Sequence, residues 1–156
     1  MPLLRNPDKT KMSKRKNDVS IPSYREKGYL PEALRNYLCL LGWSHPEGKD
    51  VFSLNEFIDT FSMDRMVKSG PIFDIAKLNW MNGKYIREVL STAELTEKLQ
   101  EYIAPDYPQE LLPKVLPLVR DRLVTLNDIN ELSEFFYKDI SHSRELLVPK
   151  KTTPEE

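Results

Sequence analysis

The sequence predicts a mainly α-helical protein composed of two small helical units in tandem. Apolar residues recur at helical spacing through most of the 156 residues, and two S-x-x-E capping boxes mark the starts of helices. Strand signals are scarce, and short extended pieces are expected at most at 19–21, near the N-terminus, and at 51–52. A chain of this length can bury a hydrophobic core without disulfides or metal ions.

Two helices are expected in the first third of the chain. One should cover 31–41, because Pro31 suits a first helical turn and Gly42 is placed to end the helix. The capping box of Ser53 and Glu56 then predicts a short helix that runs to about residue 60. Their apolar faces are formed by Leu34, Tyr37, Leu38 and Leu41 in the first helix and by Leu54, Phe57, Ile58 and Phe61 in the second.

Two more helices are expected in the middle of the chain. The first should begin after Asp74, whose side chain can cap it, and extend to Val89, although Gly83 weakens its centre. Its apolar face comprises Ile75, Leu78, Met81, Tyr85 and Ile86. A capping box that begins at Ser91 opens the next helix, and the prolines of the segment at 104–108 end it.

The last two helices are less regular in sequence. One should cover about 109–124, and its two prolines, Pro113 and Pro117, make its first half uncertain in shape. Thr125 can cap the final helix. The apolar face of that helix is expected to consist of Ile129, Leu132, Phe135 and Phe136.

These elements divide the chain into four parts. We expect a loop with a basic arm at 1–17, a helical domain at 18–90, a second helical domain at 91–148 and a disordered tail at 149–156. The boundary between the two helical domains is placed where one periodic helix ends and a capped helix begins.

Charge is spread unevenly along a chain that is nearly neutral as a whole. The 23 basic and 24 acidic residues give a net charge of −1, which excludes a generally basic nucleic-acid-binding coat. Residues 1–27 carry eight basic and three acidic side chains, a local charge of +5, so the other 129 residues sum to −6. Such an arm can attract a polyanion, and the alternative is an ordinary solvated terminus.

Cys39 is the only cysteine, and we expect it to be a buried structural residue rather than a nucleophile. It lies in an apolar helical stretch with no His or Lys nearby in sequence to stabilise a thiolate. A single cysteine excludes an intrachain disulfide and fits a reducing compartment. No apolar run is long enough to span a membrane, and the N-terminus lacks a signal-peptide pattern, so a soluble, cytoplasmic chain is expected.

Other candidate residues are interpreted as structural. His45 and His142 are expected in surface loops rather than as ligands or bases. The acidic residues are scattered without metal-ligand spacing, so no metal site is expected. Four aromatic residues at helical spacing are expected in the core rather than on a base-stacking surface, namely Tyr37, Trp43, Trp80 and Tyr85.

The chemistry is concentrated in the pentapeptide KMSKR at 11–15. Two lysines three positions apart on a loop can each donate to a different phosphate of a triphosphate, because Lys is a flexible point charge. When a nucleophile attacks the α-phosphate, negative charge moves onto the leaving pyrophosphate, and cations there stabilise the transition state. The alternative for so short a basic string is a nuclear-localisation segment.

KMSKR resembles the KMSKS-type signature of class I aminoacyl-tRNA synthetases. The blocks VSIPSYREKGYLPEALRNYLCLLGWS and FSLNEFIDTFSMDRMVKSGPIFDIAKLNWMNGKYIRE resemble bacterial-type glutamyl-tRNA synthetase from this loop through its stem-contact domain. The likeness covers residues 3–90 and continues more weakly to about residue 140, as the first part of a helical anticodon-binding region. Eukaryotic-type glutaminyl enzymes have β-barrels in that region, so the expected helices favour the glutamyl family.

The resemblance implies roles for the loop residues. Lys11 and Lys14 would be the catalytic lysines that contact the phosphates of ATP, which the full-length enzyme binds with Mg²⁺. Ser13 would shape the loop or hydrogen-bond to a phosphate. Arg15 would also line the ATP site, and it replaces the final serine of the general signature, as is usual in the glutamyl family.

The resemblance also implies contacts with tRNA. Four basic residues would bind the tRNA backbone with marked salt dependence, namely Lys16, Arg25, Lys27 and Arg35. The segment VRDRLVTL at 119–126 matches the family segment in which an arginine, here Arg122, approaches the anticodon. The alternative for each residue is an ordinary solvated charge.

The family's catalytic Rossmann domain, with its HIGH signature and glutamate pocket, would lie before residue 1. We therefore expect the isolated chain to be inactive in glutamate activation and to bind no ATP stably. In the full-length enzyme the implied partners are tRNA, ATP and glutamate, with no membrane, and a monomer is expected. The alternative is a non-catalytic helical RNA- or protein-binding module derived from a synthetase.

Overall fold

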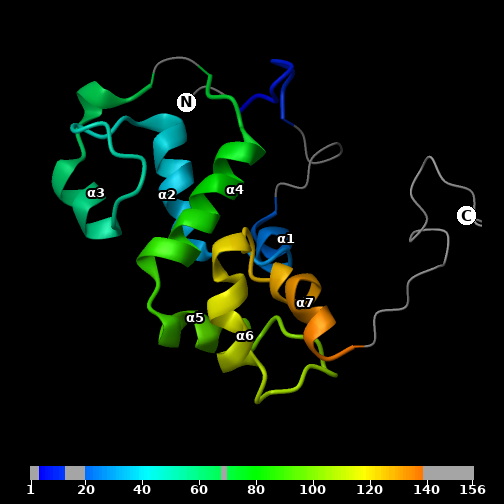
Figure 1. The fold of residues 1–156 in the computed structure, drawn as a ribbon. Coiled ribbons are helices and arrows are strands. Elements are labelled where there is room, and N and C mark those ends of the chain that lie inside the picture. Colours follow the sequence, from blue (N-terminus) through cyan, green and yellow to red (C-terminus); the bar gives the residue numbers. More distant parts are fainter. Residues whose placement is uncertain (1–3, 13–19, 68–69, 139–156) are drawn as a thin grey trace, which may run out of the picture.

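The computed structural model describes residues 4–12, 20–67 and 70–138, and this part of the chain is mainly α-helical, as predicted (Figure 1). Within it, extended pairing is limited to isolated bridges, such as the one between Trp43 and Met66. The α-helices are α1 (Ile21–Glu26), α2 (Pro31–Gly42), α3 (Leu54–Thr60), α4 (Ile75–Lys84), α5 (Thr92–Leu99), α6 (Leu112–Val119) and α7 (Asp128–Ser133). Short 3₁₀ turns are η1 (Met63–Arg65), η3 (Arg120–Arg122) and η4 (Glu134–Phe136), and η2 (Tyr85–Val89) is a π-helical extension of α4.

One apolar core joins the two halves of the described chain. α2 and α4 lie side by side, and α5, α6 and α7 pack below them in the view of Figure 1. Leu78 and Ile86 on one side and Leu95, Leu116 and Ile129 on the other are almost fully buried in the same cluster. Burial of a Leu or Ile side chain contributes about 1.5–3 kcal/mol, so this shared core fixes the second half against the first.

Four helix starts lie where local sequence signals place them, and one of them is α4, which begins directly after its predicted cap, Asp74. α2 begins at Pro31 and covers 31–42, and α3 begins after Ser53, whose hydroxyl accepts a hydrogen bond from the Glu56 N–H at 3.0 Å. The capping box before α5 is complete, because Ser91 and Glu94 each accept a bond from the other's backbone N–H. These features depend on residues within four positions, which explains why the sequence predicts them.

Three expected elements have different bounds. Ile21 begins a helix rather than an extended piece, because the Ser20 hydroxyl accepts from the Ser23 N–H and caps it.

The helix expected at 109–124 is α6, which begins at Leu112 and is followed by η3. Thr125 is not the cap of α7, since its hydroxyl donates to Asp128, the first residue of that helix. The expected extended piece at 51–52 has no strand partner in the described residues.

Several expectations about burial are wrong. His45 is 4% exposed because its ring packs edge-on against Trp43 and lies beside Phe52, which the turn-like local sequence does not reveal. Trp80 is 44% exposed, with the Lys84 ammonium 5.3 Å from the centre of its ring. The apolar faces expected for the helices are also partly solvent-facing, notably at Leu38, Ile58, Phe61, Ile75, Val89, Phe135 and Phe136.

The remaining structural expectations have mixed outcomes. Cys39 is half-buried rather than buried, and burial raises the pKa of its thiol, which disfavours the nucleophilic thiolate. Tyr37, Trp43 and Tyr85 are buried as expected. No helix within the described ranges is long and apolar enough to cross a membrane, and these ranges contain no cluster of potential metal ligands. His142 and the tail at 149–156 lie outside the described residues.

Candidate nucleotide loop and nucleic-acid interface

The N-terminal described segment, residues 4–12, forms a tight hairpin that we call the loop base. The Asn6 N–H donates to the Thr10 carbonyl at 2.9 Å, and the Met12 N–H donates to the Leu4 carbonyl at 3.1 Å. The Asp8 carboxylate accepts from the Thr10 N–H at 2.9 Å and from its hydroxyl, which closes the turn. These bonds therefore fix the position of Met12, the last residue of the loop base. Residues 13–19 lie outside the described part.

The loop base is attached to the start of α4. The Arg5 N–H donates to the Pro71 carbonyl at 3.0 Å, and the Phe73 N–H donates back to the Arg5 carbonyl at 2.8 Å. In Figure 1 this segment lies beside the N-terminal end of α4. A small cavity of about 360 Å³ separates the hairpin from α1 and α4, and Lys27 is among its lining residues.

Of the predicted ATP-contacting residues, the structure describes Lys11 alone. Lys11 pairs with Arg5 through the backbone of the loop base, and its side chain is exposed. Its ammonium has no ion-pair partner among the described residues. Ser13, Lys14 and Arg15 lie in the segment that is not described, as does Lys16. Lys11 is therefore held by its backbone while its charge stays available to an anion.

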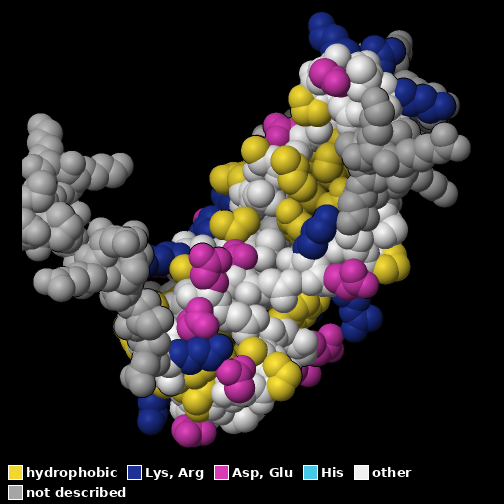
Figure 2. All heavy atoms as spheres, turned by 90° about the vertical axis from the view of Figure 1, so that its right-hand side faces the viewer, with side chains coloured by type: hydrophobic (Ala, Val, Ile, Leu, Met, Phe, Trp, Pro, Cys, Tyr) yellow, Lys and Arg dark blue, Asp and Glu magenta, His cyan; other side chains and the backbone are white. Residues whose placement is uncertain are grey.

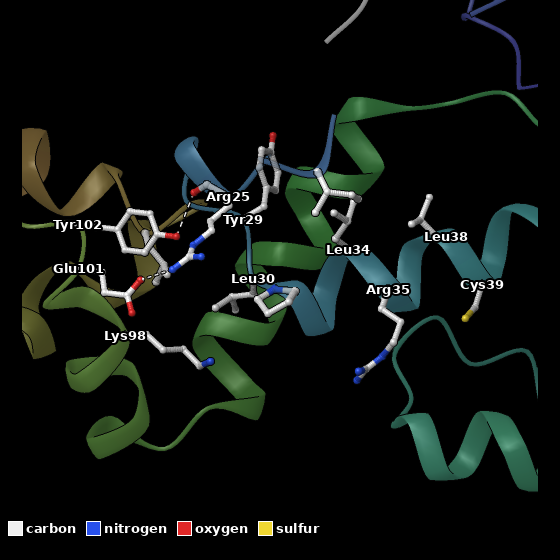
Figure 3. A pocket seen from close by; sticks show the side chains of 13 residues that line it. Arg25, Tyr29, Leu30, Leu34, Arg35, Leu38, Cys39, Lys98, Glu101 and Tyr102 are labelled. Atoms are coloured by element: carbon white, nitrogen blue, oxygen red, sulfur yellow. Dashed lines mark hydrogen bonds and ion pairs between the residues drawn. The ribbon is translucent and has the colours of Figure 1, made fainter. Parts of the chain in front are cut away.

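A larger groove of about 720 Å³ lies between α1, α2 and α5 (Figure 3). Its floor is apolar and includes Leu30, Leu34 and Leu38, which recur at helical spacing along the start of α2. Arg25 from α1, Arg35 from α2 and Lys98 from α5 add positive charge along its edges. Two of the predicted tRNA-contacting arginines thus line the same groove, whereas Lys27 lies at the smaller cavity.

The cations of the groove differ in how they are held. Arg25 donates to Glu101 at 3.1 Å, and both side chains are largely exposed. The Lys98 ammonium lies 3.3 Å from a Glu32 carboxylate oxygen. Arg35 has no ion-pair partner within the described ranges and is exposed. Arg35 is therefore the groove cation that can bind an anion without breaking another contact. The exposed ion pair of Arg25 with Glu101 contributes little free energy, so breaking it to bind an anion costs little.

Charge on the surface is mixed rather than uniformly basic. Figure 2 shows the face that lies at the right of Figure 1, and there acidic and basic side chains alternate below a broad apolar area. This arrangement agrees with the net charge of −1. Any binding of a polyanion must therefore depend on local groups of cations rather than on the field of the whole molecule.

Two arginines in η3 have opposite roles. Arg120 is half-buried, and its guanidinium donates to the Ile86 carbonyl at 2.9 and 3.1 Å, to the Leu90 carbonyl and to the Thr92 hydroxyl. Arg122 is exposed and forms no hydrogen bond or ion pair with any described residue. The first arginine ties η3 to η2, and the second is available to an external ligand.

Comparison with known proteins identifies the family. The family model described as "tRNA synthetases class I (E and Q), catalytic domain" matches residues 1–80, about half of the chain. This chain belongs to the class I tRNA synthetases. A second family model, "Anticodon binding domain", matches residues 94–156.

Curated proteins that match the chain include glutamate–tRNA ligases. The ligase of Thermus thermophilus is 47% identical over 143 residues, which are 89% of this chain and 31% of the relative. That of Ectopseudomonas mendocina is 43% identical over 157 residues, which are 100% of this chain and 31% of the relative. The chain therefore spans about a third of the length of the curated relatives that it matches.

A solved structure has the same arrangement. The glutamate tRNA ligase of Elizabethkingia meningosepticum, crystallised in complex with its amino acid, superposes with a TM-score of 0.79 at 27% identity. The match covers 99% of this chain and 34% of that protein. The resemblance to glutamyl-tRNA synthetases inferred from KMSKR and the two following blocks is thus confirmed at the level of the family.

In this synthetase family member, Lys11, Arg25, Lys27 and Arg35 fall in the part that matches the catalytic-domain model, and Arg122 falls in the anticodon-binding part. Their roles and the proposed division at residue 90 stay predictions. Sequence reasoning missed Lys98 as a groove residue, because its position beside Glu32 depends on a contact 66 residues away along the chain. No local signal could have revealed it.

Proposed function

We propose that this chain is the part of a glutamate–tRNA ligase that supplies the ATP-phosphate loop and the tRNA-binding helices. The full-length enzyme would activate glutamate with ATP and transfer it to tRNA. The observation that carries the proposal is the 43% identity to a glutamate–tRNA ligase over 157 aligned residues, which cover 100% of this chain and so include the KMSKR loop and the segment of Arg122. A cytoplasmic, monomeric enzyme without membrane contact is part of the proposal.

In the ATP step, Lys11 and Lys14 donate to the phosphates of ATP while the glutamate carboxylate attacks the α-phosphate. Their charges then lie where negative charge develops on the leaving pyrophosphate, which lowers the barrier. Ser13 and Arg15 line the same phosphates, and Mg²⁺ arrives with the nucleotide. The free ammonium of Lys11 on its hydrogen-bonded hairpin supports this assignment.

In the tRNA step, backbone phosphates are bound by Lys16, Arg25, Lys27 and Arg35. Phosphate contacts fix orientation but carry little sequence information, and they weaken steeply as salt is added. Arg122 reads the anticodon loop, because a planar guanidinium can hydrogen-bond to a base edge and stack on a ring. Its exposure and its lack of a partner in the described structure support this role.

We further propose that these 156 residues do not activate glutamate by themselves, since they span 31% of the relatives' length. Pyrophosphate exchange with ATP, glutamate and tRNA tests this directly, with an intact glutamate–tRNA ligase as the positive control. No turnover is expected from the chain alone. Turnover above the background of a Lys11→Ala, Lys14→Ala variant would overturn the proposal of inactivity.

A further inference from the structure

The turn at residues 120–124, which contains Arg122, is attached to α4 and η2 by one buried and two half-buried side chains. On its C-terminal side, Asn82 of α4 donates from its amide nitrogen to the Val124 carbonyl at 2.6 Å. The Asn82 amide oxygen accepts from the Leu30 N–H at 2.8 Å, and the residue is fully buried. Both ends of this amide are therefore used, and its orientation is fixed.

A second contact comes from Arg87. One of its guanidinium nitrogens, Nη1, donates to the Leu123 carbonyl at 3.3 Å. The carbonyl that accepts this bond belongs to the residue directly after Arg122. Together with the bonds of Arg120 to Ile86 and Leu90, this leaves the turn restrained on both sides of Arg122.

Gly83 provides the space in which Arg87 lies. A Cβ atom at Gly83 would lie 2.6 Å from Nη1 of Arg87 and 3.2 Å from its Nη2, and the three nearest atoms all belong to that side chain. The glycine that weakens the centre of α4 in sequence is thus a requirement for the guanidinium to lie along the helix and reach Leu123. A Cβ atom at position 83 would therefore displace Arg87, and the three atoms nearest to it include no backbone atom of another element.

We propose that Gly83, Asn82 and Arg87 are positioning residues that hold the 120–124 turn so that Arg122 is preorganised for RNA. The inference rests on the proposed function, because it requires Arg122 to contact RNA. A turn that is fixed before binding loses less conformational freedom when the complex forms, which increases affinity without a new contact. Positioning also favours a ligand whose bases meet Arg122 in one geometry.

The decisive variant is Gly83→Ala. Alanine is a better helix former than glycine, so the melting temperature should stay the same or rise. Affinity for purified glutamate-type tRNA should nevertheless fall by about three- to tenfold, because displaced Arg87 releases the turn. Gly42→Ala is the matched control, since a Cβ at Gly42, the last residue of α2, meets nothing within 4 Å. It should leave affinity unchanged.

Two further measurements separate positioning from direct contact. In an Arg122→Ala background, Gly83→Ala should cause no additional loss, because both changes act through one side chain. Arg87→Met should weaken binding without changing the slope of log affinity against log salt, whereas loss of a phosphate contact would reduce that slope by about one. Additive losses, or a reduced slope for Arg87→Met, would overturn the inference.

The inference and the proposed function can fail separately. If Arg122→Ala leaves tRNA affinity unchanged, the role of Arg122 in the proposed function is wrong and the positioning role falls with it. If Arg122→Ala weakens binding and Gly83→Ala does not, the proposed function stands and the positioning inference alone is wrong.

Discussion

The loop base and the 120–124 turn both present a free cation, but the chain holds them by different means. The loop base, residues 4–12, is attached to residues 71–73 by two backbone hydrogen bonds, and most of its side chains are exposed. The 120–124 turn is held by side chains from α4 and η2, with the fully buried Asn82 at the centre. Backbone pairing alone leaves a segment free to open locally, whereas buried side-chain bonds tie it to global unfolding.

This difference suits the two proposed tasks. A loop that closes over ATP and then releases pyrophosphate has to move, and a weakly attached hairpin permits that movement. A side chain that reads a base benefits from a fixed backbone, and the turn that contains Arg122 has one.

The largest effect is expected where the turn between α1 and α2 meets the start of α7. Gly28 has a φ of +81°, and a Cβ there would lie 2.6 Å from the backbone nitrogen of Asn127. Gly28→Ala should lower the free energy of unfolding by about 3–4 kcal/mol, which combines left-handed backbone strain with overpacking against main chain. Equilibrium urea unfolding measures this loss.

Gly48→Ala is the matched control for that measurement. Gly48 has a φ of +70°, but a Cβ there meets nothing within 4 Å. Gly48→Ala should therefore lower the free energy of unfolding only by the left-handed backbone strain, about 1–2 kcal/mol. Equal losses for the two variants would show that the close approach of residues 28 and 127 contributes nothing to the rigidity of this region.

Asn82→Leu should have the next largest effect. Leucine fills a similar volume but leaves the Leu30 N–H and the Val124 carbonyl without their partner, and both lie near the core. We expect a loss of about 2–3 kcal/mol in the free energy of unfolding. Urea unfolding with an unchanged m-value is the readout. A loss below about 0.5 kcal/mol would mean that the 120–124 turn is not held through Asn82.

A smaller, pH-dependent effect is expected next to the loop base. Tyr37 is buried, its hydroxyl donates to the Asp74 carbonyl at 3.0 Å, and burial raises its pKa to about 12. The unfolded chain releases this proton near pH 10, so the contribution to stability is complete below pH 10 and is lost as pH rises toward 12. The expected loss is up to about 2 kcal/mol.

Tyr37→Phe isolates this contribution from that of the other tyrosines. The difference in unfolding free energy between wild type and the variant should be constant from pH 7 to about pH 9.5 and should shrink above it. A difference that stays constant to pH 12 would show that the Tyr37 hydroxyl titrates as it does in the unfolded chain.

The smallest global effect is expected for Thr10→Val in the loop base. The variant removes the hydroxyl that bonds to Asp8 and Asn6 but keeps the backbone of the hairpin. Global stability should change by less than about 0.5 kcal/mol, because the site is exposed. Amide hydrogen exchange at Asn6 and Met12 should nevertheless accelerate several-fold, with exchange at Leu78 unchanged. Acceleration at Leu78 would show that the hairpin is part of the global folding unit.

The sequence predicts those parts of the fold that depend on near neighbours. The caps at Ser53 and Ser91 and the proline at the start of α2 each act within one helical turn, so the helices they begin are where the pattern places them. His45 and Trp80 could not be assigned in this way. How far each of these side chains is exposed depends on aromatic rings and helices that the fold brings together, and no periodicity in the sequence indicates those contacts.

The candidate site shows the same limit. Lys11, Arg35 and Arg122 could be named from the motif and its family resemblance, since the types and spacing of the residues are in the sequence. The groove that adds Lys98, and the bonds through which Asn82 and Arg87 hold the 120–124 turn, join residues 36 or more positions apart. The pattern of a single helix contains no information about such pairs.

The central claim, that this chain recognises tRNA through a fixed Arg122, is tested most directly by one ratio. The measurement is the affinity for glutamate-type tRNA divided by that for an unrelated tRNA, at a fixed salt concentration, for wild type and Arg122→Ala. The account predicts a ratio of about ten or more for the wild type that falls close to one in the variant. A wild-type ratio of one, or a ratio that Arg122→Ala leaves unchanged, would contradict it.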